Sequence, residues 1–108
     1  MARALVTLPT TARRGELIEI RCLIAHAMET GYRRGDDGRP LLRNLIRRFR
    51  CFYREEQVFE AELFAAIAAN PLLVFFLRAA ESGPLRFVWE GDEGFAQTET
   101  RELTVTAP

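Results

Sequence analysis

Regular alternation of side-chain types places the strongest constraint on the fold of this chain. Residues 18–24 and 45–53 each alternate with a period of two, which is the spacing of a β-strand whose two faces meet different surroundings. The first run sets isoleucines on one face against Glu19 and Arg21 on the other. The second run has an aromatic face and a basic one. We therefore predict two long strands in the first half of the chain.

The segment between these two runs is polar and punctuated by glycine. It begins with the sequence His-Ala-Met-Glu-Thr-Gly at residues 26–31 and continues through two arginines to Gly35 and Gly38, which mark a turn. The segment is too polar to belong to a core, so it should cross the surface. Met28 is unusual in such a loop. Either it plugs the end of the core, or it offers an adaptable apolar contact to another protein.

Further strands follow along the chain. Residues 3–8 predict a short edge strand, and residues 58–63 predict a hairpin partner for the second long strand. The continuous apolar run at residues 72–79 predicts a central strand. Alternation at residues 85–90 places Trp89 inward.

An exposed, threonine-rich strand is expected at residues 95–105. The alanine-rich piece near residues 63–69 predicts a short helical crossover, which Asn70 and Pro71 would end. The 108 residues should therefore form one domain, residues 1–108, with an all-β fold. We expect an immunoglobulin-like antiparallel β-sandwich of about seven strands.

Charge is balanced overall but unevenly distributed along the sequence. All 15 basic residues are arginines, and the formal net charge is zero. Residues 1–54 hold twelve arginines against five acids, whereas residues 55–108 hold three against ten. The arginines of the second long strand form either a solvated face or an electrostatic patch for an acidic partner or an anionic cargo. Nucleic acid is disfavoured as a partner because the chain has no net basicity and no recognised motif.

No apolar run approaches the roughly 20 residues that span a bilayer, so no membrane partner is expected. The first residues lack the apolar stretch of a secretory signal, which taken alone indicates the cytoplasm.

Few residues could support catalysis. His26 is the single histidine and has no obvious nucleophile beside it, so we expect it to make structural or interface hydrogen bonds. We predict no catalytic residue, no metal site and no cofactor. Cys22 and Cys51 lie one on each long strand. Free buried thiols are favoured, with an internal disulfide or a bond to a partner chain as open alternatives.

The run at residues 26–31, the arginine and glycine that follow it, and the two flanking strands together resemble the SoxZ family. These proteins are subunits of the thiosulfate-oxidising carrier complex of sulfur bacteria. Further matches occur in the expected order along the chain: Val58-Phe59, Ala66-Ile67, Ala69-Asn70-Pro71, Ser82-Gly83, Phe87, Trp89 and the turn from Asp92 to Gly94.

The resemblance implies a non-catalytic subunit that pairs with SoxY, as a heterodimer or larger assembly. SoxY carries the sulfur intermediate on the cysteine of a terminal Gly-Gly-Cys-Gly-Gly arm, which this sequence does not contain. Through that complex the chain would meet other Sox enzymes, and in isolation it could form a homodimer. The resemblance also implies a periplasmic location, because SoxZ is exported already bound to its signal-bearing partner.

Two surfaces are candidates for the partner interface: the polar segment between the long strands, and the arginine-rich face of the second strand. Their residues are His26, Met28, Glu29, Thr30, Arg33, Arg48, Arg50, Phe52 and Arg54. The alternative function is a stand-alone sulfur-binding or redox domain that uses Cys22 or Cys51 as the acceptor thiol. Both cysteines lie within strand patterns rather than exposed loops, which disfavours a reactive thiolate.

Overall fold

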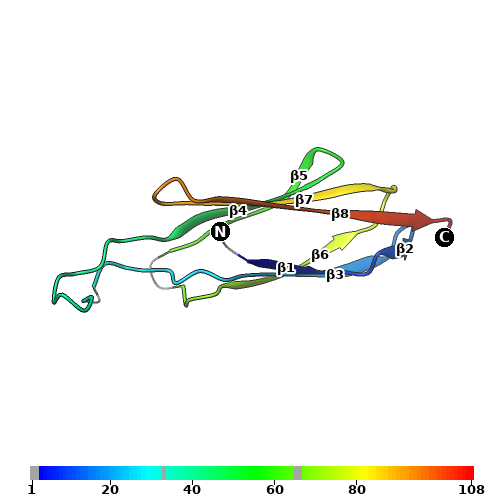
Figure 1. Ribbon diagram of the computed structural model, residues 1–108. Helices are drawn as coiled ribbons and strands as arrows, with labels where there is room; N and C mark the ends of the chain where they lie inside the picture. Colours follow the sequence, from blue (N-terminus) through cyan, green and yellow to red (C-terminus); the bar gives the residue numbers. More distant parts are fainter. Residues whose placement is uncertain (1–2, 33, 65–66) are drawn as a thin grey trace.

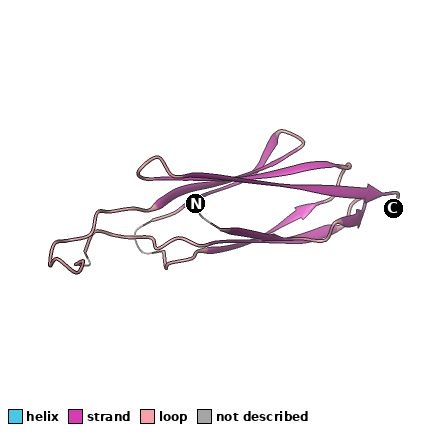
Figure 2. Cartoon of the chain, viewed as in Figure 1, coloured by secondary structure: helices cyan, strands magenta, loops and turns pink. Residues whose placement is uncertain are grey.

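The computed structural model describes residues 3–32, 34–64 and 67–108, and this part of the chain is built from β-strands without helices (Figures 1 and 2). No helix among these residues is long and apolar enough to cross a membrane. The strands are β1 (Ala4–Thr7), β2 (Thr11–Arg13), β3 (Leu17–Ile24), β4 (Ile46–Tyr53), β5 (Glu56–Glu62), β6 (Leu72–Arg78), β7 (Gly83–Gly91) and β8 (Ala96–Thr106).

The strands form two sheets that pack face to face, as Figure 1 shows. One sheet has the order β1-β3-β6, and the other has the order β2-β8-β7-β4-β5. Neighbouring strands run antiparallel, except that β2 pairs parallel to the end of β8. The predicted all-β, immunoglobulin-like sandwich is therefore confirmed. The short strand β2 is an addition to the strands predicted from the sequence.

Alternation along the strands positions the core between the sheets. The inward side of β3 is buried at every second residue from Ile18 to Ile24. Phe49 on β4 lies at the centre of an aromatic cluster, with ring contacts to Phe75 on the opposite sheet and to Trp89 on β7. Trp89 is buried, as predicted. Aromatic contacts of this kind add to the burial of apolar area that stabilises the sandwich.

The expected helical crossover at residues 63–69 is not present in its described residues. Residues 65 and 66 lie outside the described part of the chain. Of the described residues, Ile67 N donates to Phe64 O at 2.9 Å. A helix needs more length than this to repay its nucleation, and Pro71 prevents any extension.

The run at residues 72–79 was predicted to be a central strand, and this was wrong. It forms β6, an edge strand of the three-stranded sheet, which within the described part of the chain pairs only with β3. Its residues alternate between the core and solvent: Phe75 is buried, whereas Phe76 is exposed. Because both faces carry apolar residues, the sequence pattern resembled that of a strand buried on both sides.

The two long strands belong to different sheets, so residues 25–45 cross from one sheet to the other. We call this segment the crossing loop. Figure 1 shows that its middle projects beyond the end of the sandwich. Glu29 and Asn44 form a backbone bridge near its base, and Arg34 and Pro40 form another near its tip. The molecule is consequently elongated, with extents of 60 × 20 × 19 Å.

Candidate functional site

The base of the crossing loop is held by a compact set of contacts around His26. The backbone nitrogen of His26 donates to Asn70 Oδ1 at 2.9 Å, and His26 Nδ1 accepts from the backbone nitrogen of Met28 at 2.9 Å. The imidazole also meets Phe95 edge to face. Burial lowers the pKa of His26, and this outweighs the opposing effects of the Asn44 side chain and the Asp92 carboxylate.

Met28 packs into the core at the base of the crossing loop. Its side chain is only 4% exposed, and its sulfur accepts from the backbone nitrogen of Ile46 at 3.3 Å. Its φ is +51°, a left-handed conformation that non-glycine residues adopt infrequently. Of the two alternatives that the sequence left open, the structure shows Met28 plugging the end of the core.

Asp92, in the turn between β7 and β8, ties that turn to the start of β4. It accepts from the backbone nitrogen of Leu45 at 3.0 Å and from Arg47 Nε at 2.9 Å. Its own nitrogen donates to Leu45 O. The hydrogen bond from Arg47 is the main reason that the pKa of Asp92 is lowered, with the Leu45 bond second. The carboxylate therefore stays ionised and closes the same end of the sandwich.

The arginine-rich face of β4 is neutralised by the strands beside it. Arg48 lies 3.8 Å from Glu60 on β5, and Arg50 lies 2.5 Å from Glu90 on β7. In the strand register, Arg48 lies opposite Glu62 and Glu90, and Arg50 lies opposite Glu60. The arginines of β4 are therefore balanced by acids of the neighbouring strands rather than displayed as a free basic patch.

Aromatic and turn residues complete this outer face. The Phe52 ring lies under the guanidinium of Arg86, with 4.3 Å between the guanidinium carbon and the ring centroid. Arg54, in the turn after β4, pairs with Glu81. Among the described residues, no three His, Cys, Asp or Glu side chains gather into a metal-binding group.

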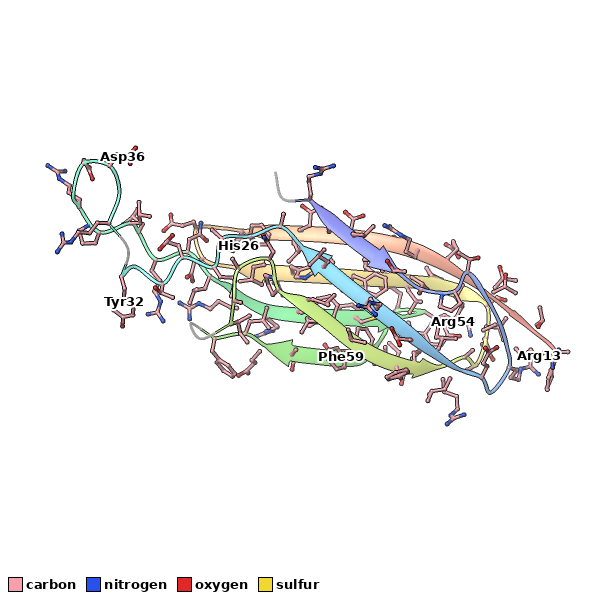
Figure 3. The ribbon with its side chains drawn as sticks, turned by 90° about the horizontal axis from the view of Figure 1, so that it is seen from below. Arg13, His26, Tyr32, Asp36, Arg54 and Phe59 are labelled. Atoms are coloured by element: carbon pink, nitrogen blue, oxygen red, sulfur yellow. The ribbon has the colours of Figure 1, made fainter. Side chains whose placement is uncertain are left out.

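The candidate interface residues do not form one site. His26 lies at the base of the crossing loop, whereas Arg54 lies toward the other end of the sandwich (Figure 3). Glu29 and Thr30 are half-buried beyond His26 along the loop. Arg33 lies outside the described residues. The residues predicted from the sequence therefore belong to two separate regions, the crossing loop and the neighbourhood of β4. Their role as partner contacts stays a prediction.

Both cysteines are free, fully buried and directed into the core. Burial raises the pKa of each thiol from 9.0 to about 12, and for Cys22 the neighbouring Cys51 adds to the effect. The favoured prediction of free buried thiols is therefore correct, and no internal disulfide is formed.

Sequence reasoning missed one surface, the outer face of the three-stranded sheet. We call it the apolar face, although its central strand also presents the ion pair between Arg21 and Glu19. Leu5, Leu23 and Leu72 lie opposite one another across its three strands and are all exposed. Val74 and Phe76 continue the exposed row along β6. Two features of the sequence could have predicted this surface: the outward Leu23 and the unbroken apolar run at residues 72–77.

A shallow pocket of about 420 Å³ continues the apolar face at the end near Leu5 and Leu23. Arg3 and Asn70 provide polar groups at its wall. Contiguous exposed apolar surface on a small protein is a common mark of an interaction site.

Comparison with known proteins identifies the family. The family model described as sulphur oxidation protein SoxZ matches residues 6–102. The chain belongs to the SoxZ family. No curated protein gives a significant match to the chain.

Solved structures with the same fold are more distant in sequence. SoxY, the sulfur carrier protein from Chlorobium limicola, matches with a TM-score of 0.65 and 14% identity over 95% of this chain and 78% of its own. A superoxide reductase (neelaredoxin) from Ignicoccus hospitalis matches with a TM-score of 0.76 and 15% identity over 95% of this chain and 80% of its own. At these identities, both likenesses show the fold alone. Membership of the SoxZ family places the chain in the context of sulfur oxidation.

Proposed function

We propose that this chain is the non-catalytic subunit of a periplasmic sulfur carrier complex. It pairs with a SoxY-like subunit, whose terminal cysteine carries the covalent sulfur intermediates of thiosulfate oxidation. The chain stabilises that carrier and presents it to other Sox enzymes. Membership of the SoxZ family supports the sulfur-oxidation context.

The burial of both thiols is the observation that carries this division of roles. A sulfur carrier needs an accessible thiolate, because the thiolate is the nucleophile that attacks or accepts sulfur. Because burial raises their pKa values to about 12, Cys22 and Cys51 stay in the thiol form at neutral pH. Neither cysteine is exposed to a substrate. These properties favour a carrier cysteine on the partner over the stand-alone sulfur-binding alternative.

Co-expression with the SoxY-like protein of the same genome tests the proposal. The complex is purified through a tag on this chain, exposed to thiosulfate with the remaining Sox enzymes, and examined by intact mass. We expect both chains in equal amounts, with added sulfur only on the partner's terminal cysteine. Purification of this chain alone, itself carrying the sulfur adduct, would favour the thiol-carrier alternative instead.

Location is tested separately by fractionation. We expect the chain in the periplasmic fraction when the signal-bearing partner is present. It should stay in the cytoplasm when the partner's signal is deleted. A chain that reaches the periplasm without that signal would contradict export in complex with the partner.

A further inference from the structure

Within the described part of the chain, the two sheets end in four strands, and three of these are protected against pairing with another chain. The four are β1 and β6 in one sheet and β2 and β5 in the other. β1 and β2 have only four and three residues. β5 presents the exposed side chains of Glu56, Glu60 and Glu62. Short length and charge are two of the ways in which natural sheets keep an edge from pairing.

The part of β8 that extends past β2 is protected by its own side chains. Thr104 N donates to Thr10 O at 2.9 Å, on the side of β8 away from β7. The direction of the backbone groups alternates along a strand, so Thr100 points to the same side. Its carbonyl already accepts from the Arg101 guanidinium at 2.9 Å, and Arg101 also pairs with Glu99 at 3.3 Å. A strand that approached here would have to displace this arginine.

The edge strand β6 carries neither form of protection. It has seven residues, and residues 72–77 include no charged side chain and no proline. Leu72, Val74 and Phe76 are exposed. A segment of about six residues with this composition, lying on a sheet edge, is typical of a strand that pairs with another copy of itself.

The backbone of β6 also directs hydrogen-bonding groups out of the sheet. Ile24 N donates to Pro71 O at 3.3 Å, so the odd-numbered residues of this segment face β3. The N–H and C=O groups of Leu72, Val74 and Phe76 therefore point to the other side. Within the described part of the chain, no strand lies on that side.

The core side of β6 is closed by this chain, whereas its edge is open. Phe75 stacks on Phe59 of β5, with 4.2 Å between the ring centroids. Figure 1 shows the hairpin of β4 and β5 rising away from β6 towards its turn. A strand can therefore be added beside β6 in the plane of its own sheet. Such a strand leaves the ion pair between Glu19 and Arg21 on β3 uncovered.

We propose that two copies of this chain pair through β6, antiparallel and around a two-fold axis at Val74. Val74 then lies opposite Val74 of the second copy, and Leu72 lies opposite Phe76. These outward residues exchange backbone hydrogen bonds across the axis. On the core side, Leu73 lies opposite Phe75. Every side-chain pair in this register is apolar, and the two three-stranded sheets become one continuous sheet.

Other registers of the same two strands fit less well. A shift by two residues in one direction places Leu72 opposite Arg78, whose guanidinium is held by the Gly15 carbonyl at 2.6 Å. A shift by two in the other direction places Phe76 opposite Asn70, which lies outside the strand. A shift by one residue puts the backbone donors and acceptors out of phase.

The pairing closes on itself. Each copy contributes the same edge, so the contact is isologous and makes a dimer rather than a fibre. The inference does not rest on the proposed function, because it concerns a contact between copies of this chain.

Lysine substitutions on two edge strands test the pairing. Val74 on β6 and Val58 on β5 are 46% and 39% exposed, so they form a matched pair. Sedimentation of the purified chain measures the dimer dissociation constant, and thermal unfolding checks that each variant folds. Val74→Lys sets two like charges opposite each other at the two-fold axis, so we expect the dissociation constant to rise roughly tenfold or more. Val58→Lys should stay within about twofold of wild type, because it lies outside the contact.

A mixture of opposite charges tests the register. Val74→Glu alone should also dissociate, for the same reason as Val74→Lys. An equal mixture of the two variants should recover most of the lost affinity, because each lysine then faces a glutamate. Non-specific association through exposed apolar residues would not distinguish the mixture from either variant alone.

Three results would overturn the pairing. The first is a wild-type chain that stays monomeric at every concentration measured. The second is an equal effect of Val58→Lys and Val74→Lys, and the third is a mixture that stays as dissociated as its components. If the chain is monomeric and Val74→Lys instead abolishes co-purification with the SoxY-like subunit, the edge belongs to that subunit. The proposed function would then stand while the dimer would not.

Discussion

The sulfur atom of Met28 lies 3.3 Å from the backbone nitrogen of Ile46 and accepts its hydrogen bond. This contact joins the beginning of the crossing loop to the first residue of β4. Met28 keeps a left-handed backbone while its side chain fills the end of the core. The beginning of the loop is therefore anchored by the packing of Met28 and by this hydrogen bond.

Met28→Leu should lower the free energy of unfolding by about 1 kcal/mol, because leucine fills the space but removes the acceptor for the Ile46 nitrogen. Urea unfolding measures the change. Leu103→Met is the control, since it is an equally buried swap of similar volume that removes no acceptor. An effect of Met28→Leu no larger than that of the control would show that the sulfur contact contributes nothing.

His26 should make the chain less stable in mild acid. Burial holds the pKa of His26 below its ordinary 6.5, so the unfolded chain takes up the proton more readily than the folded one. The stabilisation is present above pH 6.5 and is lost as the pH falls through the lower folded pKa. Urea unfolding at about pH 7.5 and about pH 5.5 measures this loss.

His26→Asn provides the matched control for the pH dependence. Asparagine retains an oxygen that can accept from the Met28 nitrogen, but it does not titrate. Because His26 is the single histidine, the variant should show a shallower loss of stability in this range. An unchanged slope would assign the acid sensitivity to other groups.

Tyr53→Phe should destabilise the turn between β6 and β7. The Tyr53 hydroxyl accepts from the backbone nitrogens of Ala80 and Glu81 at 3.2 and 2.9 Å, and it donates to the Glu81 carbonyl. Losing this hydroxyl should cost about 1–3 kcal/mol. Thermal unfolding compares the variant with Tyr32→Phe, at a residue that is 90% exposed on the crossing loop. Equal melting temperatures for the two variants would contradict the structural role of the hydroxyl.

Gly91→Ala should destabilise the sandwich more than Gly83→Ala. A Cβ at Gly91 would lie 2.4 Å from the backbone oxygen of Leu45, whereas a Cβ at Gly83 would meet the flexible side chain of Arg54. Backbone cannot move aside as a side chain can, so we expect a loss of about 1–3 kcal/mol at Gly91 and less at Gly83. Urea midpoints measure both, and the reverse order would refute the close approach.

Cys22 and Cys51 should react slowly with iodoacetamide in the native chain. Both are buried, and their pKa values of about 12 leave little thiolate at neutral pH. Mass spectrometry should show both cysteines modified quickly in urea and hardly at all without it. Rapid modification of either cysteine in the folded chain would revive the stand-alone thiol hypothesis.

The alternation of side-chain types along each strand was enough to predict most of the fold. The period of two in β3 and the inward position of Trp89 followed directly from the sequence, because each depends on one buried face. The position of β6 at the edge of its sheet could not be predicted in the same way. An apolar run indicates burial, but it does not tell whether the covering surface belongs to the same chain.

The charge of the candidate site was harder to predict from the sequence, for a related reason. Arg48 and Arg50 suggested a basic patch because their partners, Glu60 and Glu90, are distant in sequence. Only the pairing of β4 with β5 and β7 brings those acids alongside. Local pattern can identify a strand's faces, whereas the charge of a surface depends on strand order.

Dissolved salt acts differently on the exposed ion pairs and on the exposed apolar residues of the two sheets. Moderate ionic strength screens exposed ion pairs such as Arg48 with Glu60 and so loosens the five-stranded side. Sulfate and phosphate salts strengthen the burial of hydrocarbon and so favour contacts through the three-stranded side. The kind and concentration of salt in the buffer therefore shift the balance between these two kinds of interaction.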